Sequence, residues 1–404
     1  MRHLPSWSRT YNVIFFAAVV LAMSCMGLVF QRKWSALSQS GPPTYTTYQY
    51  ITYQYNVLKN PTGLLGLTRR NGQFYLYISD SGNHVVRAHN VNTGLNVVAG
   101  AVGVPGYLDG YPWSARFNYP TGLTGKNLSW RECEDPYIYK DLCWWNDYQE
   151  IYLNDSQNFV VRELKLGALP NYAAEEVSTV CGANVQGMVN GPSLSAYLGQ
   201  LGGIKETGNG TYGSYLMADS GNHALRAWDG TNVTTYAGTG GTAGYFNGYR
   251  YSAQFNAPTQ MTQDGAGNMY VADSGNNAIR KVDTAGYVTT LAGAGPSQQG
   301  HVDGQGSNAS FFRPTSVLYN PADGMTYVAD SHNNCIRQID SAGNVTTYAG
   351  TGEPGLVNGP RATAQFSLPT DLVIHNGFMF VSDSMNNVIR AINMSTGEVL
   401  TYIS

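Results

Sequence analysis

The sequence predicts an all-β fold, a six-bladed β-propeller of four-stranded antiparallel blades. Two observations lead to it, a six-fold repeated turn motif and a second, equally periodic linking motif. The turn motif is an apolar strand end, Asp-Ser, a polar turn with Asn, and a closing apolar residue followed by Arg. It occurs at 78–87, 153–162, 217–226, 270–280, 328–337 and 381–390. Such self-similarity at roughly 55 to 75 residues is the signature of a repeat architecture.

Each copy of the turn motif predicts a β-hairpin. In the fourth copy, Val271 and Ala272 end one strand, and Ala278, Ile279 and Val282 alternate with polar residues in the next. That alternation is typical of half-buried strands. The Asp-Ser-Gly-Asn segment between them is turn chemistry, because Asp and Asn side chains bond local backbone and Gly tolerates positive φ.

Two further segments complete each repeat. A Val/Thr/Tyr-rich run follows each hairpin, at 97–100, 177–182, 233–238, 288–293, 345–350 and 399–404. It suits a strand near a sheet edge. Five links then share one spacing: Gly, any residue, a hydrophobic residue, Asp or Asn, Gly, four residues, Ala, one residue, and Phe or Leu. They lie at 106–117, 187–198, 244–255, 300–311 and 355–366. A Pro-Thr pair usually opens the next strand, so each unit has four strands.

Six such units of about 50 residues predict a propeller of four-stranded blades. The combination resembles the NHL-repeat family, whose six-bladed propellers carry the Asp-Ser-x-Asn-x-x-Ile-Arg signature. The resemblance covers about Pro61 to Ser404. It implies a fold and not a function, because one fold hosts many functions.

Composition restricts the possible partners. The net charge is −3 and only 12% of residues are charged. No basic run could follow a phosphate backbone, so we expect no nucleic-acid partner, although some NHL propellers bind RNA. Low charge with abundant Gly, Tyr, Thr and Asn is typical of an extracellular repeat protein.

Residues 1–38 are expected to form a secretory signal peptide or an uncleaved signal anchor. Val13 to Phe30 is mostly apolar, and basic residues flank it on both sides. The apolar run is long for a signal peptide and short for a membrane span. Either interpretation places the propeller outside the cytoplasm, at the cell surface or secreted, with membrane contact only through this segment.

Residues 39–60 form a Tyr/Thr-rich, strand-like arm containing Tyr48, Tyr50, Tyr53 and Tyr55. The six blades of 61–404 are complete without it, so the arm is a spare strand. It could pair with the first or last blade and help close the ring. Alternatively, it could add to a neighbouring molecule's sheet and build an oligomer or filament.

The second blade carries the main insertion, 126–149. Cys133 and Cys143 lie within it, and two cysteines ten residues apart in one exported loop predict a disulfide. Asn-x-Ser/Thr sequons occur in positions expected to be loops, at Asn127, Asn209 and Asn308. In an exported eukaryotic protein these are candidate glycosylation sites.

Function is expected where the repeat is broken. The six Asp and six Arg of the turn motif occur in every blade, so we interpret them as scaffold: Asp caps the hairpin turn and Arg joins neighbouring blades. Variation concentrates after the turn Asn and in the links, on what we expect to be one Tyr-, Trp- and His-rich face. The candidate binding residues are His84, Tyr107, Tyr111, Trp113, His223, Tyr245, Tyr249, Tyr251 and His301.

These aromatic residues favour contacts with a protein partner or, by stacking, with a glycan. No nucleophile elbow, His-Glu-x-x-His or phosphate loop occurs in the sequence. We therefore predict an exported, non-catalytic binding propeller without cofactor or metal. One alternative is a metal-dependent lyase or lactonase-like hydrolase that uses the central channel, since secreted NHL-like amidating lyases bind metals through histidines. A second alternative is a filament subunit assembled through the arm.

Overall fold

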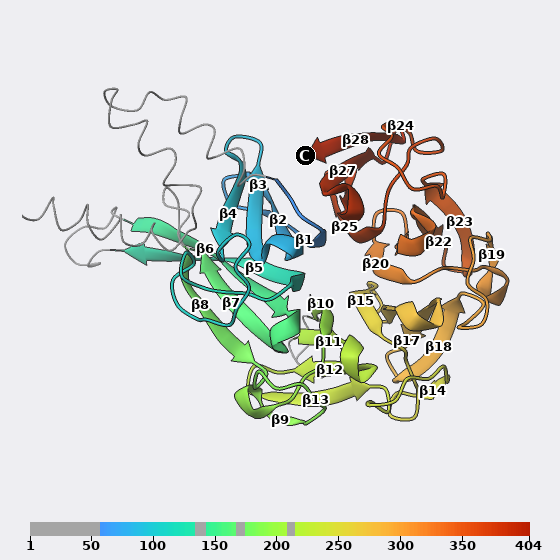
Figure 1. Cartoon of the computed structure of the whole chain (residues 1–404), viewed down its shortest axis with the longest axis horizontal. Helices are drawn as coiled ribbons and strands as arrows, with labels where there is room; N and C mark the ends of the chain where they lie inside the picture. The colour runs from blue at the N-terminus through green and yellow to red at the C-terminus, as the bar shows by residue number, and fades with distance from the viewer. Residues whose placement is uncertain (1–56, 134–142, 167–173, 208–214) are drawn as a thin grey trace, which may run out of the picture. The chain divides into compact units, whose positions relative to one another are not determined.

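The computed structural model describes residues 57–133, 143–166, 174–207 and 215–404. The signal or anchor segment, nearly all of the arm (39–56) and Asn209 lie outside the described residues. Six antiparallel sheets stand around a central axis (Figure 1). The predicted six-bladed propeller is thereby confirmed.

Each blade is built from consecutive segments of the chain. Blades 1 and 2 comprise β1 (Pro61–Thr68), β2 (Phe74–Asp80), β3 (Val85–Asn90) and β4 (Gly94–Ala99), then β5 (Pro120–Cys133), β6 (Cys143–Asp155), β7 (Val160–Leu166) and β8 (Ala174–Cys181). Blade 3 comprises β10 (Leu201–Glu206), β11 (Tyr215–Asp219), β12 (Ala224–Trp228) and β13 (Asn232–Ala237). Blade 4 comprises β15 (Pro258–Gln263), β16 (Met269–Asp273), β17 (Ala278–Val282) and β18 (Tyr287–Ala292).

Blades 5 and 6 repeat the pattern. They comprise β20 (Pro314–Asn320), β21 (Met325–Asp330), β22 (Cys335–Ile339) and β23 (Asn344–Ala349), then β25 (Pro369–His375), β26 (Phe378–Asp383), β27 (Val388–Asn393) and β28 (Glu398–Ile403). The links contribute short fifth strands that pair with the outer strand of the following blade: β9 (Gly191–Pro192), β14 (Gly248–Tyr249), β19 (Gly304–Gln305) and β24 (Gly359–Pro360). The links therefore lie along the outer edges of the blades.

The hairpin turns are short 3-10 helices: η1 (Ser81–Asn83), η2 (Ser156–Asn158), η4 (Ser220–Asn222), η5 (Ser274–Asn276), η7 (Ser331–Asn333) and η8 (Ser384–Asn386), with η3 (Ser193–Ser195) and η6 (Gly306–Asn308) in links. The positive φ that we expected at Gly falls instead on the residue after Asn, for example His84 (φ 59°) and His223 (φ 56°). That residue ends the 3-10 turn in the left-handed region, which Asn and His adopt more readily than most residues.

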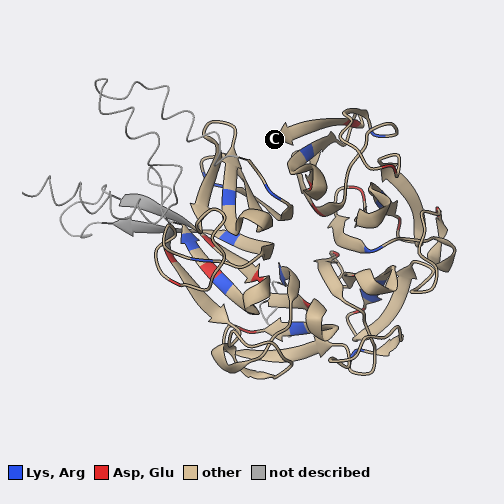
Figure 2. Cartoon of the chain, viewed as in Figure 1, with Lys and Arg blue, Asp and Glu red and all other residues tan. Residues whose placement is uncertain are grey.

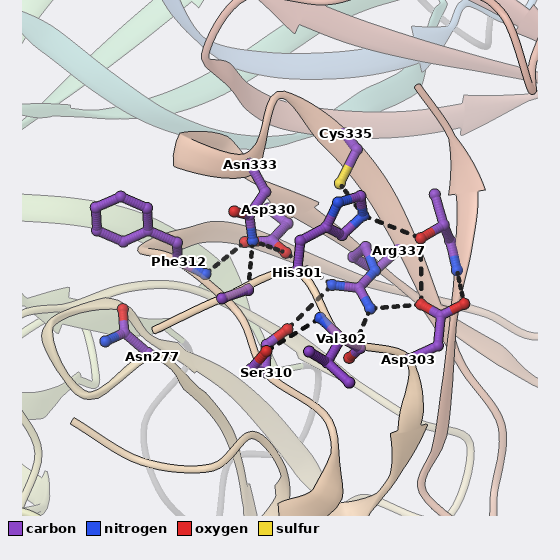
Figure 3. Close-up of polar contacts among 12 residues, drawn as sticks. Asn277, His301, Val302, Asp303, Ser310, Phe312, Asp330, Asn333, Cys335 and Arg337 are labelled. Atoms are coloured by element: carbon purple, nitrogen blue, oxygen red, sulfur yellow. Dashed lines mark hydrogen bonds and ion pairs between the residues drawn. The ribbon is translucent and has the colours of Figure 1, made fainter. Parts of the chain in front are cut away.

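The turn aspartates and arginines are buried scaffold. In all six blades the carboxylate accepts from the guanidinium at 2.5–3.0 Å, and both side chains are fully buried. We expected Asp to cap its own turn, and that detail is wrong. In blade 5, Asp330 Oδ1 accepts from the N–H of Phe312, which follows the link, while Arg337 donates to the link carbonyls of Val302 and Ser310 (Figure 3). In blades 2 to 6 each pair thus anchors a link to the blade that follows it.

Hydrogen bonds between the first and last blades close the ring. Thr370 Oγ1 donates to the carbonyl of Pro61 (3.1 Å), and the N–H of Asn60 donates to Asn387 Oδ1 (2.8 Å). Because β28 supplies the outer strand of blade 6, all four strands of each blade come from within 61–404, as the sequence predicts.

The insertion 126–149 is largely an extension of the hairpin β5–β6 and not a loop. The register runs from Lys126 opposite Glu150 to Cys133 opposite Cys143. Asn127, expected in a loop, lies in β5, where its Nδ2 donates to the carbonyl of Thr68 (2.7 Å). Among the described residues, no helix has the length and apolar character needed to cross a membrane.

Candidate functional site

The two histidines after the turns act as clasps between blades. His84 Nδ1 accepts from the N–H of Tyr119 (3.1 Å), and His223 Nδ1 accepts from the N–H of Ala257 (3.0 Å). In blades 4 to 6, Asn side chains at the same position make the same bond, as Asn277 does with Arg313 (2.9 Å). Burial, and secondarily Lys59, lowers the pKa of His84, which favours the neutral acceptor form. Both histidines therefore have a structural function.

Three other candidates fix links onto outer strands. Tyr107 and Tyr245, at the second position of their links, meet the hydroxyls of Thr179 and Thr290 at 3.1 Å. His301 occupies the same position, and its Nε2 meets Thr347 Oγ1 at 3.1 Å.

His301 Nε2 also lies 3.5 Å from the sulfur of Cys335. Figure 3 shows this contact. This Cys–His contact is not an activated nucleophile. Cys335 is fully buried, and burial, reinforced by Asp330, raises the pKa of its thiol. A thiol that stays protonated at neutral pH is a weak nucleophile. Among the described residues, no three His, Cys, Asp or Glu side chains gather as metal ligands would.

The remaining four candidates form two separate patches at the tips of links, where each link turns back along the outer edge of a blade. The blade 2 tip consists of Tyr111 and Trp113, which are 60% and 65% exposed and stack with ring centroids 4.9 Å apart. The sequence placed all nine candidates on one face. The structure instead distributes them between inter-blade clasps and two outer edges.

The blade 4 tip consists of Tyr249 and Tyr251, which are 41% and 55% exposed. Tyr249 packs edge-on against Tyr251 and against Tyr287 of β18, with centroids 5.7 and 5.6 Å away. The Arg250 guanidinium lies over the Tyr251 ring at 4.9 Å. Tyr287 was missed because it follows a turn in a strand that we interpreted only as scaffold.

A polar cluster on the innermost strands was also missed. The third residue of the inner strands is Gly in blades 1 to 3, but Gln260, Ser316 and Asp371 in blades 4 to 6. Asp371 accepts from Ser316 Oγ and from the N–H of Leu64 at 2.8 Å each, and Gln260 is a further partner. Burial raises the pKa of Asp371 to about 6. The change from Gly to polar residues at the third position of the inner strands is the sequence signal that could have predicted this cluster.

This cluster joins neighbouring blades. Asp371 is only 4% exposed, and a Cβ on Gly203 would lie 1.9 Å from Gln260 Oε1, so the Gln260 amide packs directly against the inner strand of blade 3. The carboxylate joins blades 5 and 6 to β1.

Charge is sparse over the whole propeller, as Figure 2 shows. Exposed contacts must therefore depend mainly on aromatic and neutral polar side chains. Fold and surface together define a class: a six-bladed propeller whose blade edges carry aromatic link tips.

Known proteins agree with this class. No family model matches the chain. It is 29% identical over 372 residues to Protein SUPPRESSOR OF QUENCHING 1, chloroplastic, of Arabidopsis thaliana, covering 84% of the chain and 31% of that protein. It is 27% identical over 355 residues to human NHL repeat-containing protein 2, covering 80% of the chain and 45% of that protein. The chain thus spans less than half of either relative.

A solved structure shares the fold. It is a protein of unknown function from Bacteroides thetaiotaomicron, with a TM-score of 0.55 and 16% identity over 83% of this chain and 69% of that one. The repeats, the six blades and the named relatives together support an NHL-repeat propeller.

Proposed function

We propose that this chain is a non-catalytic scaffold that contacts protein partners through its aromatic link tips. The observation that carries the proposal is the exposure of Tyr111, Trp113 and Tyr251, at 55–65% each, on tips whose rings contact mainly one another. Tyr and Trp dominate the energy of protein interfaces because they bury large areas at little conformational cost.

The internal repeats supply a control for this proposal. Leu194 occupies the position of Trp113 and Tyr251 in the link before blade 3, and it is 60% exposed. Exposure is therefore matched, while aromatic character differs. A contact role predicts that the aromatic tips, and not this leucine, are needed for partner binding.

We also propose that the propeller functions outside the cytoplasm. Support comes from the apolar segment 13–30 and from the register that places Cys133 opposite Cys143 across β5 and β6. Directly opposed cysteines suit a cross-strand disulfide, which persists in oxidising compartments. Asn308 is exposed in a link and remains a candidate glycosylation site.

The experiment compares partner recovery by tagged full-length variants from the native source. Trp113→Ser and Tyr251→Ser are each paired with Leu194→Ser, and co-purified proteins are quantified by mass spectrometry. Loss of the same partners in either aromatic variant, with recovery retained in the leucine variant, supports the proposal. Equal recovery in all three variants rejects it.

A further inference from the structure

An open cavity of about 140 Å³ lies at the seam between blades 3 and 4, near the blade 4 tip. Tyr236 of β13 and Arg250 of the link line one part of it. Gln263 of β15, with Asp283 and Thr284 of the turn between β17 and β18, line another.

The seam between blades 5 and 6 has the same framework. Arg361 and Tyr348 stand at the positions of Arg250 and Tyr236. Each guanidinium lies over its tyrosine ring, at 4.8 Å and 5.5 Å respectively. Each link also donates its arginine N–H to a turn glycine of the following blade, Gly397 at 2.7 Å and Gly286 at 2.8 Å. The two seams are therefore matched internal copies.

Three substitutions distinguish the seams. In blades 5 and 6, Tyr327, Ile374 and Met394 join one hydrophobic cluster with Tyr348. Their counterparts in blades 3 and 4, by position in the repeat, are Leu216, Gln263 and Thr284, which all line the cavity. Large apolar groups are thus replaced by smaller or polar ones, and packing is replaced by a cavity with polar side chains in its lining.

The rim changes together with the cavity. Tyr249, Tyr251 and Tyr287 at the blade 4 tip correspond to Pro360, Ala362 and Glu398 in the other seam. A Cβ on Gly286 would lie 3.2 Å from the ring of Tyr249, so this cavity residue and the tyrosine tip are adjacent. Aromatic faces beside a polar cavity are thus a property of this seam and not of the repeat.

The lining indicates the chemistry of the ligand. Asp283 and Arg250 offset each other in charge, which disfavours a strongly anionic or cationic ligand. Gln263 and Thr284 offer neutral donors and acceptors, although Gln263 Nε2 also donates to the carbonyl of Gly267 (3.3 Å). Asp283 Oδ2 adds a charged acceptor, since the described bond to Asp283 uses Oδ1 alone, from the N–H of Tyr287 (2.8 Å). Exposed tyrosine faces suit the C–H face of a sugar ring. We propose that this cavity binds a neutral saccharide of one or two rings.

This proposal rests on the proposed function, in which the blade 4 tip contacts a partner. It specifies that the partner bound beside this tip is a glycan. The probes are maltose, cellobiose, lactose and diacetylchitobiose, titrated by saturation-transfer NMR against the full-length protein up to about 10 mM. Thr284→Met fills the cavity with the side chain found in blade 6. Ser341→Met is the matched control, because Ser341 is exposed at the same turn position of blade 5.

We expect at least one disaccharide to bind, with affinity reduced at least tenfold by Thr284→Met and unchanged by Ser341→Met. Gln263→Ile, which copies Ile374, should weaken the same sugar, and melting temperatures verify that each variant is folded. If none of the four sugars binds, or if both cavity variants bind like the wild type, the saccharide site is rejected. Partner loss in Trp113→Ser would still uphold the proposed function, so the two failures are distinguishable.

Discussion

Replacing Asp371 by Asn should change how the stability of the propeller depends on pH. Asp371 Oδ2 accepts from the N–H of Leu64 in β1, and Oδ1 accepts from Ser316 Oγ. The carboxyl is 4% exposed, and no cation pairs with it among the described residues. Burial without a counter-charge disfavours ionisation, and Asn keeps the shape without titrating.

The magnitude follows from the pKa, which burial raises from 3.8 to about 6. Two pH units correspond to about 3 kcal/mol. Because the folded pKa lies above the unfolded one, the folded protein binds the proton more tightly. The stability contributed by this proton is present below about pH 4 and is lost as pH rises to about 6.

Urea unfolding of both proteins at pH 4, 5, 6, 7 and 8 measures the effect. At pH 4 the variant should be about 1 kcal/mol less stable than the wild type, because Asn accepts one hydrogen bond fewer. Its stability relative to the wild type should then rise by up to about 3 kcal/mol between pH 4 and pH 7. Other titrating groups cancel in this difference. A difference that stays constant with pH would refute the assignment of a buried, uncompensated carboxyl to Asp371.

Two further predictions concern contacts between blades. His223→Asn should leave the free energy of unfolding within about 0.5 kcal/mol, since Asn277 makes the same clasp, whereas His223→Ala should lose about 1 kcal/mol; equal losses in urea unfolding would disprove the clasp. Gly63→Ala would place a Cβ 2.2 Å from the carbonyl oxygen of Thr121 and should lower the free energy of unfolding by about 1–3 kcal/mol. Gly265→Ala meets nothing within 4 Å and should be tolerated. Equal melting temperatures of the two variants by calorimetry would contradict this packing.

The repeat motifs were sufficient to predict the fold. Six turn motifs and five identically spaced links define blade number, strand order and the scaffold role of residues such as Asp330 and Arg337. Spacing alone could not reveal which partner each group meets. Asp330 accepts from the backbone 18 residues upstream, after the link, and bonds its own turn only through the Asn333 side chain and not through a turn N–H. Such contacts depend on how the link folds back over the blade.

The candidate site was predictable only in part. The exposed tips at Trp113 and Tyr251 were identified, because departures from a repeat are visible in sequence. His84 and His223 were attributed to binding because nothing in the sequence shows that imidazole replaces Asn as a backbone acceptor. The cavity near Thr284 could not be predicted from the sequence. It arises where Thr284 replaces the methionine found at the matching position of blade 6, and this difference matters only when the two seams are compared in space.

Site-specific photo-crosslinking tests the contact role of the link tips most directly. A benzophenone amino acid would be introduced at Trp113, Tyr251 or Leu194 of the full-length protein, the native mixture irradiated, and adducts mapped by mass spectrometry. The account predicts defined protein adducts from Trp113 or Tyr251 and none of these from Leu194. The same adducts from all three positions, or none from either aromatic tip, would contradict it.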